Sequence, residues 1–356
     1  MKKISLLIVC ILSAALFCNA QGAADSLLNF IRNNKSRSSV YLVQNDTVLA
    51  RLNENQLMPL ASTVKIMVAI EFAKQAGAKV INEETMVPLS ELDKYYLPNT
   101  DGGAHPRWID NETKLHHIKN EAVKLIDVAR GMILFSSNAN TEYLMDLLGL
   151  DNVKNNIQLL RLKQHTAIYP LVASLFMYQN PHQKKEASIL KEIKKLSDEQ
   201  YSRFIYAIHN TLKYDTVLKL RFRPQDLSMN MQKLWSDRLP SSTTKEYVQI
   251  VSALNNRRYF EEPAYAVLSK VLESIMENNA NSKWLKHAGM KGGSTSWVLT
   301  KALYATTKDG TRIEMAYFFN NLLPEENKKL QGWMNGFELK ILSDNNFRKQ
   351  SQSLLN

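Results

Sequence analysis

The sequence predicts an α+β fold, in which an antiparallel sheet with flanking helices lies beside an all-helical lobe. Strand-like segments near the start of the chain, at 39–44 and 47–52, are joined by a two-residue turn. Two segments near the end, at 296–306 and 311–319, are rich in aromatic and β-branched residues. The long region between them shows helical periodicity. The simplest arrangement is a single sheet built from both ends of the chain, with the helical middle packed beside it.

Helices are predicted wherever apolar residues recur every three or four positions. The stretch 92–111 is predicted as a loop, because it contains two prolines and two adjacent glycines. A binding site is expected between the two lobes. The predicted helices cover 24–34, 62–75, 121–134, 141–148, 152–160, 186–213, 245–255, 264–277 and 323–342.

The first residues form a predicted export signal. Met1–Lys3 is positively charged, and an almost unbroken apolar run follows to Phe17. Small residues then precede Gln21, so we expect cleavage before this residue and a periplasmic or secreted protein. The apolar run is shorter than the roughly 20 residues of a membrane span, which disfavours the alternative of a retained anchor. No stable membrane span is expected after cleavage.

Composition and motifs exclude several classes of function. Both cysteines, Cys10 and Cys18, lie in the leader, so neither a disulfide nor a thiolate metal site is expected. The formal net charge of +11 is dispersed through helical patterns, and we expect no nucleic-acid partner. The side chains of the adjacent His116 and His117 point in different directions, and neither has a second metal ligand at helical spacing. This favours a surface or packing role over a metal site. No phosphate loop or dinucleotide motif occurs in the sequence, and no cofactor is expected.

One short motif combines a nucleophile with a base. Ser62 and Lys65 are three positions apart at the start of a predicted helix, where they share one face. A serine hydroxyl needs a neighbouring base, and a desolvated lysine can be neutral and take its proton. The free N–H groups at a helix start also favour a developing oxyanion. The same spacing recurs at Ser188 and Lys191, in a charged helix that is predicted to lie at the surface.

Two further motifs follow in order along the chain. Ser136–Asn138 lies between two predicted helices, and Lys291–Thr295 directly precedes a predicted strand. Similar triplets occur at 228–230, 308–310 and 343–345, but these lie in the wrong order or in a turn. Order and context therefore distinguish the three motifs from chance matches.

The ordered set S-x-x-K, S-x-N and K-x-G resembles the motifs of class A β-lactamases and their penicillin-recognising relatives. The surroundings of the first two motifs, 58–65 and 131–138, resemble those of the family as well. The resemblance covers most of the chain after the leader, apart from a divergent or inserted segment at about 175–241. It implies the β-lactamase/transpeptidase-like fold and a small-molecule substrate.

The resemblance also implies one catalytic domain over 21–345, acting as a monomer, after a signal peptide over 1–20. Residues 346–356 are expected to form a C-terminal tail. The domain is expected to consist of a sheet lobe at about 21–57 and 285–345 and a helical lobe at about 58–284.

The resemblance implies a role for each residue of the three motifs. Ser62 would be the nucleophile, and Lys65 would be its base or proton relay. Ser136 would pass the proton to the leaving amine, while Asn138 would hold the substrate amide. Lys291 would lie near Ser136 and help to bind a substrate carboxylate.

The oxyanion hole would consist of backbone N–H groups of Ser62 and Ser294, with Gly293 beside them. One such donor is typically worth ~10²–10³ in rate. The hydroxyls of Ser294 and Thr295 are candidates for contact with the substrate carboxylate.

Two departures from the family pattern concern turnover. Gly292 stands where the family has threonine or serine, so one carboxylate-binding hydroxyl is missing. The family's water-activating glutamate is also missing, because no glutamate occurs between Asp151 and Lys185 and the matching stretch 166–174 is apolar. His165 and the loop at 93–105 are the alternatives for this task. The sequence predicts efficient acylation and slow deacylation.

Three functions remain open at this point. The first is hydrolysis of a β-lactam through an acyl-enzyme. The second is a D-alanyl-D-alanine carboxypeptidase-like peptidase or an esterase, which would act on a peptidoglycan-like amide or ester with a carboxylate. The third is a penicillin-binding or sensing module that is acylated once. The number of substrate equivalents consumed distinguishes an enzyme from such a module.

Overall fold

A computed structural model describes residues 22–179 and 184–356. The predicted signal peptide, residues 1–20 with cleavage before Gln21, lies outside the described residues. Within the described ranges, no helix combines the length and apolar character that crossing a membrane requires.

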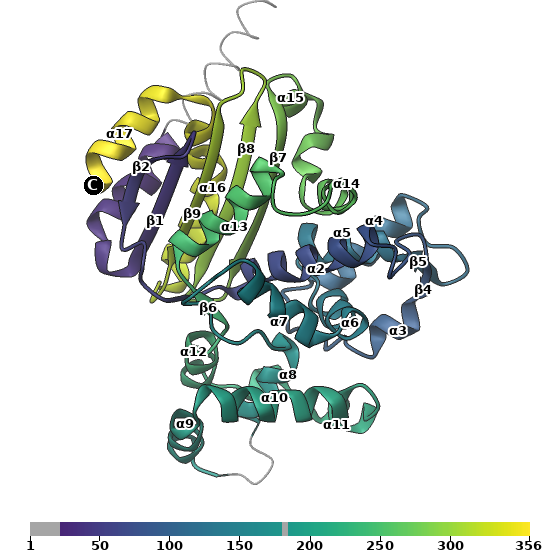
Figure 1. Cartoon of the computed structure of the whole chain (residues 1–356). Coiled ribbons are helices and arrows are strands. Elements are labelled where there is room, and N and C mark those ends of the chain that lie inside the picture. The colour runs from purple at the N-terminus through teal and green to yellow at the C-terminus, as the bar shows by residue number, and fades with distance from the viewer. Residues whose placement is uncertain (1–21, 180–183) are drawn as a thin grey trace, which may run out of the picture.

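The predicted sheet from both ends of the chain is confirmed. Five strands lie in the order β2-β1-β9-β8-β7, and every neighbouring pair is antiparallel (Figure 1). The strands from the chain start pair with those from its end, because β1 lies beside β9. The sequence missed β7, since its glycines weaken the strand pattern. The strands are β1 (Ser38–Gln44), β2 (Thr47–Leu52), β7 (Leu285–Ser294), β8 (Leu299–Thr307) and β9 (Arg312–Phe319).

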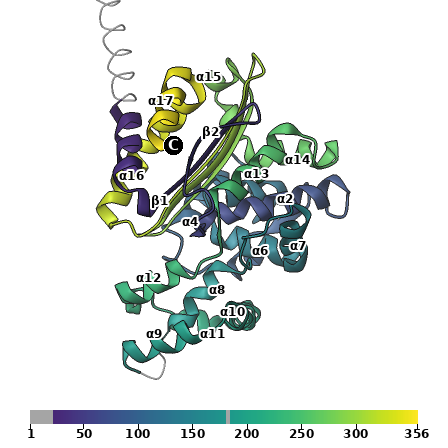
Figure 2. The same ribbon diagram turned by 60° about the vertical axis from the view of Figure 1, so that its left-hand side comes forward.

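Helices cover both faces of the sheet (Figure 2). Residues 22–33, α16 (Pro324–Ser343) and α17 (Asn345–Leu355) pack on one face around a separate hydrophobic cluster. Helix α17 forms where a tail was expected. The amide nitrogen of Arg51 donates to Asn356 Oδ1 at 3.0 Å, and Asn356 Nδ2 donates to Leu49 O at 3.0 Å. The chain end thus covers β2, an edge strand whose unpaired groups would otherwise be exposed.

The helical lobe packs on the other face of the sheet around α2, whose residues 65–73 are all buried. Its 3-10 turn η2 (Ala61–Val64) leads directly into α2. Short strand pairs β3–β6 and β4–β5 brace its connections. The elements here are α2 (Lys65–Gly77), α3 (Leu89–Asp93), α5 (Leu125–Leu134), α6 (Asn138–Leu148), α7 (Leu150–Leu159), α13 (Thr244–Asn256), α14 (Glu262–Leu272), α15 (Asn279–Ser282), η5 (Ser274–Glu277), β3 (Met58–Pro59), β6 (Ser241–Ser242), β4 (Met86–Pro88) and β5 (Ala122–Lys124), whereas η1 (Lys35–Arg37) directly precedes β1.

The predicted loop at 92–111 was partly wrong, because α4 (Ala104–Lys114) begins inside it. The Asp101 carboxylate accepts hydrogen bonds from the backbone amides of Gly103, Ala104 and His105 at 3.0–3.1 Å, which satisfies free donors of the first turn. Pro106 is also in that turn, where a missing N–H removes no helical hydrogen bond. Turn-forming residues thus mark the helix start rather than a continuing loop.

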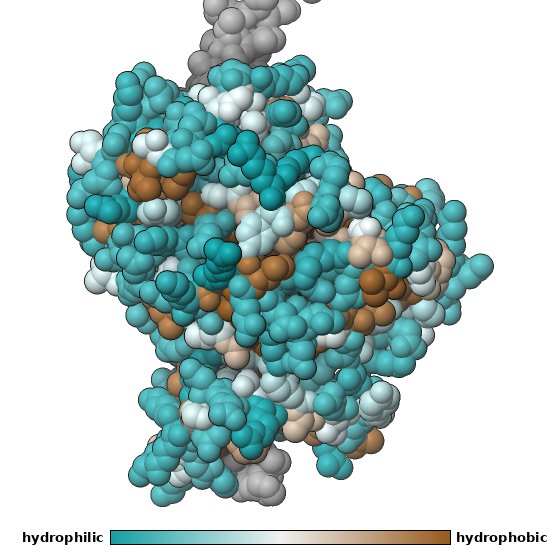
Figure 3. All heavy atoms as spheres, in the orientation of Figure 1, coloured by the Kyte–Doolittle hydropathy of each residue, from teal (hydrophilic) through white to brown (hydrophobic). Residues whose placement is uncertain are grey.

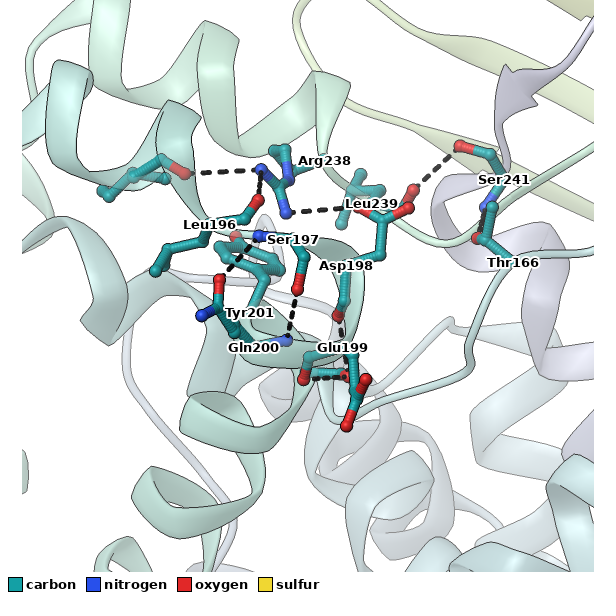
Figure 4. Close-up of polar contacts among 12 residues, drawn as sticks. Thr166, Leu196, Ser197, Asp198, Glu199, Gln200, Tyr201, Arg238, Leu239 and Ser241 are labelled. Carbon is teal, nitrogen blue, oxygen red and sulfur yellow. Dashed lines mark hydrogen bonds and ion pairs between the residues drawn. The ribbon is translucent and has the colours of Figure 1, made fainter.

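The segment at about 175–241, which was expected to be divergent or inserted, forms most of a helical extension below the two lobes in Figure 1. The predicted single helix at 186–213 is broken, because Ser197 and Gln200 form a capping box that starts a second helix. Arg238 closes this break by donating to Leu196 O at 3.1 Å and to Asp198 at 3.2 Å (Figure 4). The extension contains α8 (Leu171–Leu175), η3 (Phe176–Tyr178), α9 (Glu186–Lys195), α10 (Asp198–Leu212), α11 (Thr216–Arg221), η4 (Pro224–Asp226) and α12 (Met229–Asp237).

A buried ionic network joins this extension to α6. His209 of α10 lies 3.2 Å from Glu142 and 2.9 Å from Asp146, and Lys213 lies 2.7 Å from Asp146. Burial alone would lower the pKa of His209, but hydrogen bonds to the two carboxylates outweigh burial and raise it to about 9. Protonated His209 therefore stabilises the contact between the extension and the helical lobe.

The His209 network makes stability depend on pH. Because the folded pKa is raised, its contribution is complete below pH ~6.5 and is lost as pH rises to about 9. The loss should reach roughly 3 kcal/mol, the equivalent of this shift. Thermal unfolding of the wild type should show a steeper decline over this range than that of His209→Gln. Identical slopes in the two proteins would contradict the assignment.

Candidate active site

A cleft of about 1130 Å³ lies where the sheet, the helical lobe and the extension meet. Its walls include α12 and α16, in addition to the ends of α5 and β7. On the face shown in Figure 3, hydrophobic side chains form separate groups on a mainly hydrophilic surface. Seven predicted site residues line the cleft: Ser62, Ser136, Asn138, Lys291, Gly293, Ser294 and Thr295. The eighth, Lys65, is fully buried.

Ser62 lies in η2, one turn before Lys65. A 3-10 turn stacks residues three positions apart, so the predicted proximity of the two residues does not need an α-helix here. Ala61 precedes the serine with a φ of +45°, a conformation that is strained for a residue with a Cβ. Among the described residues, none forms a hydrogen bond with the Ser62 hydroxyl, which is therefore available to a ligand in the cleft.

Lys65 has the environment of a neutral amine. Its Nζ donates to Ser136 O at 2.6 Å and to Asn138 Oδ1 at 2.8 Å. Burial lowers its pKa to about 7, against the opposing effects of the Asp101 and Glu142 charges. A neutral amine has two N–H donors and one lone pair. Because two acceptors use the donors, the lone pair is left for a proton from a neighbouring hydroxyl.

Ser136 connects the two lysines of the site. Its φ is +68°, a conformation that costs a residue with a Cβ roughly 1–2 kcal/mol. This backbone presents the carbonyl to Lys65, while the hydroxyl accepts a 2.7 Å hydrogen bond from Lys291 Nζ. Burial, followed by the charges of Lys65 and Lys301, holds the pKa of Lys291 well below its usual range. Ser136 therefore lies in a chain of groups that can exchange protons.

The K-x-G motif lies at the end of β7, a strand that the sequence did not predict, and the strand expected after the motif is β8. Gly293 passes so close to η2 that a Cβ there would lie 2.4 Å from Ser62 N and 2.7 Å from Leu60 O. β7 is also the last strand of the sheet, so its outer edge has unpaired backbone groups. The close approach brings the backbone of Ser294, the next residue, to the edge of the cleft beside Ser62.

Thr300 holds this approach in place, and the sequence reasoning missed it. It is fully buried on β8, opposite Gly293. Its hydroxyl lies 2.8 Å from Thr63 Oγ1, 2.8 Å from Leu60 O and 3.2 Å from Gly293 O. No motif contains Thr300. Only the register between β7 and β8 would have identified it.

Thr295 does not have a free hydroxyl. Its Oγ1 accepts from the backbone amides of Trp297 at 3.2 Å and Val298 at 3.1 Å, and lies 2.6 Å from Ser236 Oγ on α12. This threonine therefore closes a turn and docks the extension against the cleft. Ser294, by contrast, is exposed.

Lys301 lies close to the place that the side chain of a threonine or serine at position 292 would occupy. A Cβ on Gly292 would lie 3.5 Å from Lys301 Nζ, and the two residues face each other across β7 and β8. Lys301 also lies 3.4 Å from Glu338 on α16. Both side chains line the cleft, so the lysine supplies a cation beside Lys291.

The stretch that replaces the family's glutamate loop is tied to the fold. The backbone amide of Thr166 donates to Ser241 O at 2.9 Å, and α8 follows (Figure 4). The Val172 amide donates to Glu142 at 2.5 Å. His165 bonds to Thr166 O at 2.7 Å and Tyr247 at 3.3 Å, and it does not line the cleft.

The loop at 93–105 contributes residues 99–102 to the cleft. Asp101 is among them, but its carboxylate caps α4. His105 points instead into the lobe, where it lies 2.9 Å from Ser137 Oγ and packs against Tyr96. The second S-x-x-K copy, Ser188 and Lys191, lies outside the cleft lining on α9.

The sequence model of the β-lactamase enzyme family matches residues 22–264. The structure is similar to the TLA-3 extended-spectrum β-lactamase, with TM-score 0.53, 13% identity and coverage of 90% of this chain and 99% of that chain. It is also similar to a β-lactamase from Chitinophaga pinensis DSM 2588 (0.52, 13%, 89% and 98%) and to a class A β-lactamase from Mycobacterium abscessus (0.53, 11%, 90% and 97%). At these identities the likeness shows the fold alone. No curated protein sequence matches the chain.

The approach of Gly293 to Ser62 can be tested directly. In Gly293→Ala the Cβ would meet backbone atoms, which have little freedom to shift. We expect covalent labelling by a fluorescent penicillin to slow at least ~100-fold, because misplacement by about 1 Å has such an effect. Gly332→Ala is the matched control, since nothing lies within 4 Å of the added Cβ and labelling should be unchanged. Labelling of Gly293→Ala at the wild-type rate would refute the predicted geometry.

Proposed function

Because the chain belongs to the β-lactamase enzyme family, we propose that it is an exported, monomeric serine hydrolase whose Ser62 forms an acyl-enzyme. The substrate is a β-lactam or a related amide or ester. The observation that carries the proposal is Lys65, fully buried, with two neutral acceptors for its two N–H groups. In its neutral form such an amine keeps one free lone pair and can act as a base for Ser62, which lies one turn away and lines the cleft.

Acylation proceeds through proton transfer and electrostatic stabilisation. Ser62 Oγ attacks the substrate carbonyl carbon while its proton moves to Lys65 Nζ. The backbone amides of Ser62 and Ser294 hold the oxyanion that forms. When the intermediate collapses, the bond to the leaving nitrogen breaks and Ser136 donates a proton to that nitrogen. The proton that Lys65 took from Ser62 then returns to Ser136, whose hydroxyl also accepts a hydrogen bond from Lys291, so no proton is gained or lost in acylation.

The substrate carries a carboxylate. Lys301 brings a positive side chain and Lys291 a buried amine to one wall of the cleft, and Ser294 presents an exposed hydroxyl beside them. A carboxylate bound there is stabilised by the nearby charges, which compensate for the hydroxyl that Gly292 lacks. The extended edge of β7 then aligns the amide with Ser62 and Asn138.

Deacylation is slow, because the carboxylates that line the cleft have other partners. The Asp101 carboxylate caps α4. Glu277 pairs with Arg130 at 2.6 Å. Glu338 lies 3.4 Å from Lys301 and accepts a hydrogen bond from Tyr317. A base that activates water contributes typically ~10²–10⁴-fold, and these groups are not free to supply it.

Because acylation is expected to be faster than deacylation, penicillin hydrolysis should begin with a burst. Penicillin should be consumed rapidly up to one equivalent and then slowly, with an adduct on Ser62 in intact-mass spectra. Ser62→Ala should lose the adduct, whereas Ser188→Ala, the same substitution in the second S-x-x-K copy, should keep it. Fast hydrolysis without burst or adduct would contradict slow deacylation. An adduct that persists in Ser62→Ala would overturn the mechanism.

The same experiment separates the alternatives. A carboxypeptidase-like enzyme or esterase would turn over a D-alanyl-D-alanine peptide or an ester many times while penicillin stays bound. A sensing module would stop at one equivalent with every substrate.

The pKa of Lys65 sets the pH dependence of acylation. Only the neutral amine accepts the Ser62 proton, so the rate constant should rise with pH and level off above about pH 7. Two units below this pKa the neutral fraction is ~100-fold smaller, and so is the expected rate at pH 5. Stopped-flow measurements with a chromogenic β-lactam give this profile. A flat profile between pH 5 and 8 would show that Lys65 is not the base.

A further inference from the structure

A second group of side chains lies outside the cleft, where α4 ends and α5 begins. Glu112 is on α4, His117 follows that helix, and Asp127 is in the first turn of α5. One ligand atom from each of the three residues lies within 4.8 Å of the other two. The three residues have no part in the proposed hydrolysis.

The packing of α4 against α5 explains why these residues meet. Trp108 of α4 packs against Gly131 of α5, where an added Cβ would lie 2.5 Å from the indole nitrogen. Glu112 is four positions after Trp108, and Asp127 is four positions before Gly131. One turn forward from this contact along α4 and one turn back along α5 lead to the two carboxylates, which lie within 4.8 Å of each other. The residue pairing is thus set by the helix register rather than by a flexible loop.

The group carries uncompensated negative charge. Glu112 and Asp127 are only 5% and 8% exposed, and buried carboxylates need partners. The nearby basic side chains are already paired, Lys124 with Glu84 at 2.6 Å and Arg130 with Glu277 at 2.6 Å. Among the described residues, the remaining side-chain partners are the imidazole of His117 and the neutral amide of Asn111, whose Nδ2 donates to Glu112 Oε1 at 3.1 Å. Two buried carboxylates facing one imidazole favour an additional cation.

We propose that Glu112, His117 and Asp127 bind a divalent transition-metal ion of the zinc type. Imidazole nitrogen and carboxylate oxygen are ligands that Zn²⁺ accepts, with water completing the coordination. His117 Nδ1 lies 2.7 Å from Glu112 Oε2 and 3.9 Å from Asp127 Oδ1. These separations bracket the ~3.3 Å between neighbouring ligands of a tetrahedral zinc ion. The His117 side chain is 42% exposed and gives the ion a route from solvent.

The ion would link the C-terminal end of α4 to the first turn of α5, away from the catalytic motifs. At the other end of this helix pair, His105 of α4 lies 2.9 Å from Ser137 Oγ, within the S-x-N motif. The metal therefore stabilises the frame of the helical lobe without contacting substrate. Its sequence signal is weak, because one histidine is joined by carboxylates five positions before and ten positions after it.

The test uses untagged full-length protein freed of metal by a chelator. Calorimetric titration with Zn²⁺ should show one ion per chain, and Zn²⁺ should raise the melting temperature by several degrees. His117→Gln should weaken zinc affinity at least ~tenfold, the lower end of the loss seen even for groups that only orient a ligand. His116→Gln is the matched control: it alters the adjacent exposed histidine and should leave binding intact.

Asp127→Asn separates metal binding from structural damage. It keeps the shape of the side chain and removes one of two buried like charges, so the metal-free protein should unfold at the same or a higher temperature. Its response to Zn²⁺ should be lost. A zinc response retained in His117→Gln or Asp127→Asn, no response in the wild type, or a Ca²⁺ response that survives His117→Gln would overturn the proposal. No substrate is involved, so the outcome is independent of the proposed function.

Discussion

The chemistry that we propose for this protein depends on the removal of one lysine amine from water. Lys65 begins the central helix of the helical lobe, and its acceptors, the carbonyl of Ser136 and the amide oxygen of Asn138, are both neutral. A carboxylate in either place would keep the amine protonated. Asp101 and Glu142 act only from a distance and do not offset burial. The strained backbone of Ser136 is consistent with this requirement, since it turns a carbonyl rather than a charged group toward the lysine.

A second constraint is the contact between the sheet and the helical lobe. Gly293 allows β7 to touch the backbone of Ser62, and Thr300 ties both segments together from β8. The nucleophile, the oxyanion donors and the lysines come from separate parts of the chain, so their mutual positions depend on this contact. A side chain at Gly293 would separate the two lobes at the point where they form the site.

Local patterns predicted much of this structure, whereas contacts between distant segments were not predictable. Strands β1, β2, β8 and β9 and the pairing of Ser62 with Lys65 follow from short-range periodicity and spacing, whereas β7 was missed. Helix α4 was missed because Gly102 and Pro106 are typical of loops, although an aspartate cap makes them a helix start. Thr300 and Lys301 were missed because their roles depend on strand register, which a single sequence does not specify. The proposed metal site was missed for a similar reason, as the register of two helices brings its carboxylates together.

The slow deacylation proposed here follows from packing as well as from one missing residue. Glu142 lies one helical turn after Asn138, but the Val172 amide and His209 hold its carboxylate, and both belong to the extension or its attachment. The replacing helix α8 buries its side chains at exposures of 0–7%. A glutamate introduced there would place an unpaired carboxylate in an apolar interior, which favours its neutral form and disfavours its action as a base. In the proposed mechanism the extension thus supplies a wall of the cleft in place of a water-activating group, and we expect a longer-lived acyl-enzyme as the physical consequence.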